Sequence, residues 1–223
     1  MTNDLPTLRA PADMLPQLRK LIPQRPLTYG QALTLAERQA GAVRRLLGNK
    51  QAALDLSWLF TLEEISVTFR PEYRMPDHTS GLTTRMNDVL TIVMNASEGR
   101  LRQRFTLAHE LKHVLDFDLV DTTYSKLGRG DAKRQGEQIE WICNRFAACL
   151  LMPKVWLNRL WTRGIQDPLA LAHVFQVSAE AMAIRLETLG FASAPEPPRD
   201  TFFRQTVVPA PMLTVPSVPC SSV

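Results

Sequence analysis

The chain has 223 residues, of which 45% are hydrophobic, enough to bury one substantial core or one core with a small appendage. Its formal net charge of +4 is mild and does not demand a nucleic-acid partner, so we expect none. No apolar run approaches the roughly 20 residues of a membrane span, and the first residues lack a basic-then-apolar signal pattern. We therefore expect a cytoplasmic protein without a membrane partner. Three cysteines, an odd number, do not indicate a disulfide framework.

The amino-terminal region combines a proline-containing lead with a long helix. Residues 1–27 contain five of the chain's 16 prolines, so we expect an extended or partly helical segment there. The next helix is predicted from Thr28, a favourable N-cap, to Leu47, because Gly48 follows and the apolar positions suit one buried face. Several arginines are expected on solvated faces of this helix and of a later one: Arg44, Arg45, Arg100, Arg102 and Arg104.

Three strands are predicted after a short helix near residues 54–60. Residues 65–69 alternate apolar and polar side chains, as in a half-buried strand. Residues 81–86 and 89–94 are two further candidates, and Asn87-Asp88 between them predicts a two-residue hairpin turn. An edge strand beside the metal of a hydrolase can pair with an extended substrate backbone. We hypothesise this role for one of these strands.

Residues 104–116 are predicted to form a helix that carries the sequence His109-Glu110-Leu-Lys-His113. Two histidines four residues apart share a helix face, so both imidazoles can bind one metal ion. Glu110 lies beside that face and can accept a proton from a water molecule that the ion activates. The same pattern also occurs by chance on solvated helices, but apolar residues at helical spacing indicate a half-buried helix here: Leu107, Leu111, Val114 and Leu115. We expect no metal role for the other two histidines, His78 and His173.

A hydrolytic zinc site needs three protein ligands and one open position. The best candidate for the third ligand is Glu140, in a helix with an apolar face that begins near Glu137 and is ended by Pro153. Glu137 is the rival ligand, and either carboxylate would in isolation more often be a solvent-facing helix residue. Asn144 shares the face of Glu140 and can hydrogen-bond a metal ligand. Two cysteines of this helix are expected to be small core residues: Cys143 and Cys149.

The segments around this second helix contain weaker candidates. Residues 118–136 are polar and are predicted as a loop or short helix over the cleft. Within them Tyr124 is a candidate to stabilise a developing oxyanion, as is Arg102 elsewhere, although packing of the tyrosine ring is the simpler interpretation. Residues 169–189 resemble a helix-turn-helix, but Arg185 is the only cationic side chain of their second helix. We therefore expect these helices to pack against the core rather than to read DNA.

Residues 102–117 and 140–153 together resemble the ImmA/IrrE family of metallopeptidases. In that family the HExxH helix is followed by a helix of the pattern E-x-x-x-N-x-F-A-A-x-L-L-M-P, which this chain matches from residue 140. The resemblance covers about residues 28–190 and implies an α+β fold, a gluzincin-like core with a small antiparallel or mixed sheet packed on the HExxH helix. Many relatives carry glycine in place of Lys112, which we expect to face away from the metal. The resemblance implies Glu110 as the catalytic base and three metal ligands: His109, His113 and Glu140.

The function implied by the resemblance is that of a zinc-dependent endopeptidase, although Mn²⁺ or Fe²⁺ would suit the same ligands. Its implied partner is a protein substrate, a helix-turn-helix transcriptional repressor in stress or mobile-element regulation. Two alternatives stay open: a catalytically silent regulatory or antitoxin-like binding module, and a DNA-binding regulator that uses the C-terminal helices. We divide the chain into four parts. Residues 1–27 are a lead and residues 28–153 a metallopeptidase core. Residues 154–190 are a helical C-terminal part and residues 191–223 a Pro-rich tail predicted to be flexible.

Overall fold

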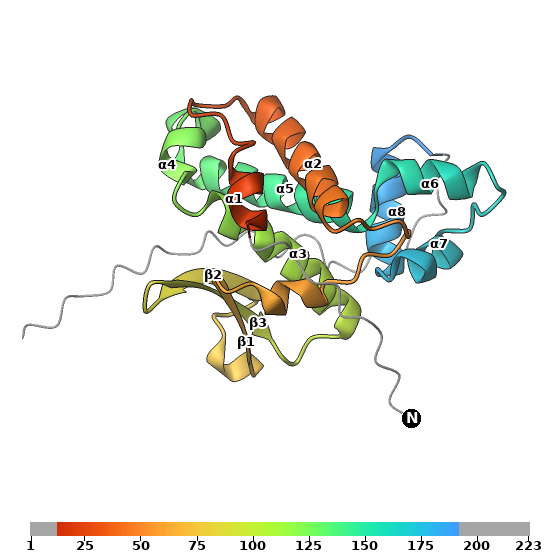
Figure 1. Ribbon diagram of the computed structural model, residues 1–223, viewed down its shortest axis with the longest axis horizontal. Helices are drawn as coiled ribbons and strands as arrows, with labels where there is room; N and C mark the ends of the chain where they lie inside the picture. Colours follow the sequence, from red (N-terminus) through yellow and green to blue (C-terminus); the bar gives the residue numbers. More distant parts are fainter. Residues whose placement is uncertain (1–12, 192–223) are drawn as a thin grey trace, which may run out of the picture.

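A small mixed sheet, one central helix and a pair of long helices form successive layers in the computed structural model, which describes residues 13–191 (Figure 1). The sheet contains β1 (Ile65–Arg70), β2 (Gly81–Met86) and β3 (Val89–Asn95) in the order β1-β3-β2. β1 runs parallel to β3, whereas β2 runs antiparallel to it. The predicted α+β class and small sheet are therefore confirmed, and β2 is an outer strand.

The hairpin between β2 and β3 follows from two residues that tolerate the left-handed conformation. Asn87 has a φ of 49° and Asp88 a φ of 64°. Positive φ at both central positions is characteristic of the type I′ turn, whose twist matches that of paired strands. The turn places Met86 opposite Val89 and Gly81 opposite Met94, so the predicted hairpin is confirmed.

The central layer is α3 (Arg100–Asp116), which lies between the sheet and the outer helices (Figure 1). Its apolar stripe is buried, as predicted, and packs against β2 and β3 on one side and α5 (Ala132–Leu151) on the other. The outer layer consists of α5 and α2 (Tyr29–Leu46). The N-cap of α2 is Thr28, whose side chain forms a capping box with Gln31.

Short elements connect and cover these layers. α1 (Met14–Arg19) buries Met14, Leu15 and Leu18 in the core that it shares with α2 and α3. The predicted short helix is the 3-10 helix η1 (Ser57–Thr61), and η2 (Glu72–Arg74) follows β1. The polar segment between α3 and α5 contains two further turns of helix: α4 (Val120–Thr123) and η3 (Leu127–Gly130).

Between Pro153 and Phe191 three helices pack at the carboxyl end of α5 (Figure 1): α6 (Lys154–Trp161), α7 (Pro168–Phe175) and α8 (Ala179–Thr188). Arg185 of α8 is 4% exposed, and its Nε donates to the carbonyl of Met152 at 3.1 Å. This contact confirms the predicted packing of the pair against the core. Among residues 13–191 no single helix is long and apolar enough to span a membrane, and α7 and α8 reach that hydropathy only as a pair bent by 107°. The predicted Pro-rich tail, apart from Phe191, lies outside the described residues.

Of the arginines expected on solvated faces, one is instead buried and another is partly buried, so that expectation was wrong for them. Arg44 is 7% exposed and donates to the carbonyl of Leu150 at 2.9 Å. Arg104 donates to the carbonyl of Leu54. Each guanidinium satisfies a main-chain carbonyl where two segments meet, a tertiary role that helical periodicity does not reveal.

A buried ionic network lies beside the two histidines on α3. Lys112 is fully buried, and its ammonium lies 2.6 Å from both carboxylate oxygens of Asp116. The phenol of Tyr124 donates to the same carboxylate at 2.5 Å. Burial, followed by the charge of Asp116, raises the pKa of Tyr124 far above its usual value, so the phenol keeps its proton as a donor. The network joins α3 to the segment that follows α4.

We expect Asp116→Asn to lower the free energy of unfolding by about 3–5 kcal/mol, because it leaves the ammonium of Lys112 buried without its counter-charge. The matched control is Asp118→Asn, which removes the exposed Asp118–Arg85 pair and should change stability by at most about 1 kcal/mol. Urea denaturation of both variants measures the difference. Equal losses in the two variants would contradict a structural role for the network.

Candidate metal centre

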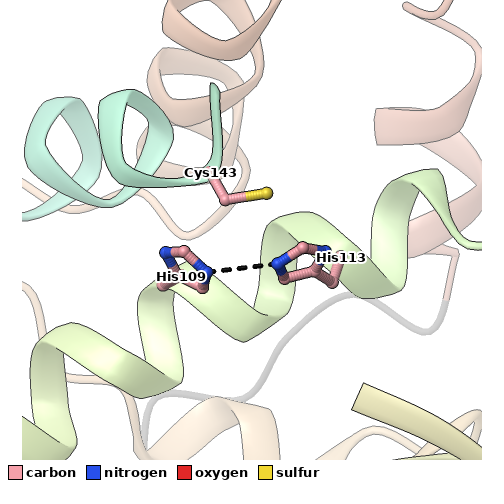
Figure 2. Close-up of side chains that lie close together, drawn as sticks. All are labelled: His109, His113 and Cys143. Carbon is pink, nitrogen blue, oxygen red and sulfur yellow. Dashed lines mark hydrogen bonds between the residues drawn. The ribbon is translucent and has the colours of Figure 1, made fainter. Parts of the chain in front are cut away.

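The two histidines of the HExxH sequence meet on the face of α3 that is turned toward α5. The Nε2 atoms of His109 and His113 lie 3.1 Å apart, and their rings are tilted by 54°. Figure 2 shows both imidazoles between the two helices, with Cys143 of α5 above them. The four-residue spacing on one regular helix is sufficient to produce this arrangement.

Glu140 of α5 completes a triangle with the two imidazoles. One carboxylate oxygen lies 3.1 Å from Nε2 of His109, and the other lies 3.4 Å from Nε2 of His113. Donors bound about 2.0–2.2 Å from a tetrahedral ion are separated from one another by roughly 3.3–3.6 Å. The observed spacings, which involve one carboxylate oxygen for each histidine, are close to this range, so the three side chains could hold one divalent ion.

Asn144 contacts the ring nitrogen of His109 that is turned away from the other metal donors. Its Oδ1 lies 2.9 Å from Nδ1 of His109. A proton on Nδ1 donates to this amide oxygen, which leaves the lone pair of Nε2 available to a metal ion. Glu140 and Asn144, four residues apart on α5, therefore contact the same imidazole from one helix face.

The charges of the site favour a cation. Burial acts to raise the pKa of Glu140, but hydrogen bonds and charge interactions with His109 and His113 outweigh it and hold that pKa well below its usual range. Burial acts to lower the pKa of His113, but contacts with Cys143, Glu140 and Glu110 outweigh it and raise that pKa well above 6.5. The carboxylate is thus charged at neutral pH, and without a metal the neighbouring imidazole compensates it by binding a proton.

Cys143 is a donor that the sequence analysis did not assign to the site. It is fully buried, as expected of a core residue, but its sulfur and donor nitrogens of His109 and His113 all lie within 4.8 Å of one another (Figure 2). Burial raises the pKa of the thiol, which disfavours the thiolate that binds metals. Glu140, which the imidazoles keep ionised, meets the charge requirement of a metal ligand better than the neutral thiol. The position of Cys143, three residues after Glu140 on the same helix, was the signal that could have identified it.

Glu110 occupies the opposite flank of the histidines, under the outer strand β2. It is 4% exposed, and the hydroxyl of Thr83 donates to its Oε2 at 2.8 Å. Gly81 permits this close approach of strand and helix, since a Cβ there would lie 2.6 Å from a methyl of Thr106 and 3.3 Å from Cγ of Glu110. β2 therefore positions the carboxylate, through residues that the sequence analysis had not singled out.

The structure separates the weaker candidates from this cluster. Glu137, the rival ligand, makes no ion pair with a histidine among the described residues. Tyr124 is fully buried with its hydroxyl committed to Asp116, so it is not turned toward a substrate. Arg102 donates to the hydroxyl of Ser80. The remaining two histidines lie in the loop before β2 and on the exposed side of α7: His78 and His173.

An HExxH helix joined to a carboxylate-bearing second helix in an α+β domain is the arrangement of a metallopeptidase. Residues 65–187 match the family described as the IrrE N-terminal-like domain. Because this match covers more than half of the chain, the protein belongs to the ImmA/IrrE family of metallopeptidases.

Two curated relatives share part of the sequence. The radiation response metalloprotease IrrE of Deinococcus deserti is 36% identical over 107 residues, which are 47% of this chain and 37% of that protein. The protein of the same name from Deinococcus radiodurans is 34% identical over 86 residues, 37% of this chain and 25% of its own length. The matched regions therefore span about a third or less of these relatives.

A solved structure resembles the fold more widely. A Mycobacterium tuberculosis transcriptional regulator superposes with a TM-score of 0.55 at 19% identity, over 83% of this chain and 53% of that one. At this identity the likeness concerns the fold alone.

Replacement of single donors should identify the third ligand. We expect Glu140→Gln to lose bound zinc on dialysis, because an amide replaces the carboxylate that lies within 3.4 Å of both imidazoles. The matched control Glu137→Gln, one turn earlier on α5, should retain it, as should Cys143→Ala. Elemental analysis of the purified proteins measures the metal. Retention by Glu140→Gln together with loss by Cys143→Ala would instead assign the third position to the thiol.

Protons should compete with the metal for His113. Since its pKa in the metal-free protein is raised well above 6.5, metal binding at pH 7 must displace a proton. Metal affinity should therefore rise with pH through the neutral range and level off only above the raised pKa. Calorimetric titrations at pH 7 in buffers of different ionisation enthalpy count the protons released. Binding without proton release at that pH would contradict the assignment.

Proposed function

We propose that this protein is a zinc-dependent endopeptidase of the gluzincin-like type, which cleaves a specific protein partner. The observation that carries the proposal is the triangle formed by His109, His113 and Glu140, with Glu110 beside it. Three donors at tetrahedral spacing leave a fourth direction for water or substrate. The family membership supports peptide-bond hydrolysis as the reaction.

The proposed chemistry needs a base next to the metal. A zinc ion held by the three donors would lower the pKa of water and polarise the scissile carbonyl. Glu110 takes the proton from the attacking water and returns it to the leaving amine. Thr83 holds one oxygen of the Glu110 carboxylate at 2.8 Å, which leaves the other oxygen for this proton transfer.

The proposed path of the substrate backbone is along β2. This strand is at the edge of the described sheet, and its residue Thr83 contacts the proposed base. An extended peptide paired with the free edge would pass beside Glu110 and the metal donors. Main-chain hydrogen bonds would then orient the scissile bond independently of its side chains.

We further propose that the partner is a helix-turn-helix transcriptional repressor, cut at one site in a stress response or in the control of a mobile element. The radiation response for which the Deinococcus relatives are named supports the regulatory setting. Residues 28–153 would form the metallopeptidase core and residues 154–190 its helical extension.

The alternative of a DNA reader on α8 is not favoured by the contacts of this helix. Its single cation, Arg185, is 4% exposed and bonded to Met152 and Cys149. Base and phosphate contacts need exposed donors. A silent binding module is equally disfavoured, because the base and all three donors are present.

Glu110→Gln tests the catalytic assignment. The variant should retain zinc, since the base is not a ligand, but its cleavage rate should fall by about 10²–10⁴-fold through loss of general-base catalysis. The measurement is the rate of a discrete cut in a repressor encoded near this protein, followed by mass spectrometry with and without chelator.

The control for this experiment is Glu98→Gln, two residues before the start of α3. It alters a carboxylate that accepts a hydrogen bond from Ser80 and should leave the rate within about twofold. Full activity of Glu110→Gln would refute its role as base. Cleavage by the wild type that persists in chelator would refute the metal-dependent mechanism.

A further inference from the structure

Arg85 lies on β2, the strand along which the substrate backbone is proposed to run. Side chains two residues apart in a strand point to the same face, and Thr83, two residues earlier, contacts the proposed base Glu110. Arg85 is therefore on the side of β2 that faces α3, about 7 Å along the strand from Thr83. Its contacts agree with this placement, because they are with Phe117 and Asp118 at the carboxyl end of α3. The guanidinium thus lies beside the proposed substrate path, past the level of the base.

The guanidinium of Arg85 is held in position but is still open to solvent. Its central carbon lies 5.2 Å from the ring centre of Phe117, a stacking that favours a cation. Its Nη2 lies 2.6 Å from one carboxylate oxygen of Asp118, and the two side chains are 43% and 59% exposed. A guanidinium has five N–H donors, so a contact through one nitrogen leaves donors for a second carboxylate. An exposed pair also adds little stability, so a carboxylate from another molecule can compete with Asp118.

Positive charge exceeds negative charge where β2 and α3 end. A recess of about 340 Å³ there is lined by Asp118 and by two cations, Arg19 of α1 and its C-cap Lys20. Together with Arg85, three cations therefore share the carboxylate of Asp118. An anionic group that enters this region meets a net positive surface, which favours its binding.

The other end of β2 provides a contrast. Ser80, the residue before β2, accepts a hydrogen bond from Arg102 at 2.9 Å and donates one to Glu98 at 2.5 Å. Nε of Arg102 lies 3.7 Å from the same carboxylate of Glu98, whose second oxygen is buried without a hydrogen-bond partner among the described residues. The charge of Arg102 is thus already balanced by a less exposed carboxylate. We therefore expect a preference for an acidic group only at the Arg85 end.

We propose that Arg85 is a specificity-determining residue, which binds an acidic side chain of the substrate, two residues from the one that pairs with Thr83. The inference rests on the proposed peptidase function and adds a charge preference to it. In paired strands the residue opposite Arg85 has its Cβ about 4.5–5.5 Å away and points to the same face. A glutamate or aspartate at that position can reach the guanidinium without leaving the strand.

The test uses zinc-loaded full-length protein and alanine-based phosphinic peptides, which carry a metal-binding phosphinate in place of the scissile amide and extend on both sides of it. Each peptide contains one glutamate, at a different position, and the corresponding glutamine peptide is its reference. At low salt, glutamate should improve binding by about fivefold at one position only, near the upper end for an exposed ion pair. At high ionic strength the gain should fall toward unity.

Variants of Arg85 assign the gain to this residue. Arg85→Gln should abolish it, and Arg85→Glu should transfer it to lysine at the same peptide position. Arg163→Gln, which removes an exposed cation from the turn after α6, is the matched control and should retain the preference for glutamate. A gain that Arg85→Gln retains would overturn the inference.

Asp118→Asn gives a measurement in which Arg85 itself is intact. Loss of the competing carboxylate should increase the glutamate gain by about twofold or more, whereas a purely structural ion pair would leave it unchanged. An unchanged gain would therefore count against the inference, as would equal binding of glutamate and glutamine peptides at every position. Both results would leave the metal centre standing. Failure of every phosphinic peptide to bind, with no zinc in the protein, would overturn the proposed function and this inference with it.

Discussion

The rotational setting of α3 about its own axis is the constraint on which the candidate site depends. Three contacts hold it from three directions. Thr83 of β2 binds Glu110, the carboxylate of Glu140 on α5 lies against the two imidazoles, and Lys112 reaches Asp116 and Tyr124 in a buried network. A turn of the helix by one residue, about 100°, would break the contacts with Thr83, Glu140 and Tyr124. The Lys112–Asp116 pair lies within α3 and would turn with the helix. The helix is therefore held in place by its neighbours before any metal arrives.

The same contacts explain how a dense group of ionisable side chains is stable in a largely apolar interior. Glu110 and Glu140 lie on opposite flanks of the imidazole pair, so the histidines separate the two carboxylates. Each carboxylate also has a short-range partner, Thr83 for the first and the two imidazoles for the second. A divalent cation would replace the proton that His113 holds in this arrangement and raise the local net charge by one unit, which the ionised Glu140 favours. Preorganisation of this kind lowers the cost of metal binding.

Much of the architecture was predictable because its causes are local. The capping box at Thr28, the left-handed pair Asn87-Asp88 and the apolar stripe of α3 are each determined by a few neighbouring residues. The donor cluster was predictable because each of its halves lies on one helix with a four-residue spacing. What could not be predicted depends on contacts between distant segments. Gly81 and Thr83 act on Glu110 only because β2 lies over α3. The burial of Arg44 and the partial burial of Arg104 reflect carbonyls 106 and 50 residues away.

The attachment of Arg185 to the end of α5 has a consequence for how the molecule can be divided. Its guanidinium satisfies the carbonyl of Met152, the last residue before Pro153, where an α-helix leaves carbonyls without partners of its own. Cutting the chain after Pro153 would expose that carbonyl and uncover the apolar side of α5. We therefore expect the helices after Pro153 to behave as a structural part of the α+β domain rather than as a detachable module. Substitutions on the outer faces of these helices would leave the contact between Arg185 and Met152 intact. Substitutions on their inner side would disturb the end of α5, the helix that carries Glu140.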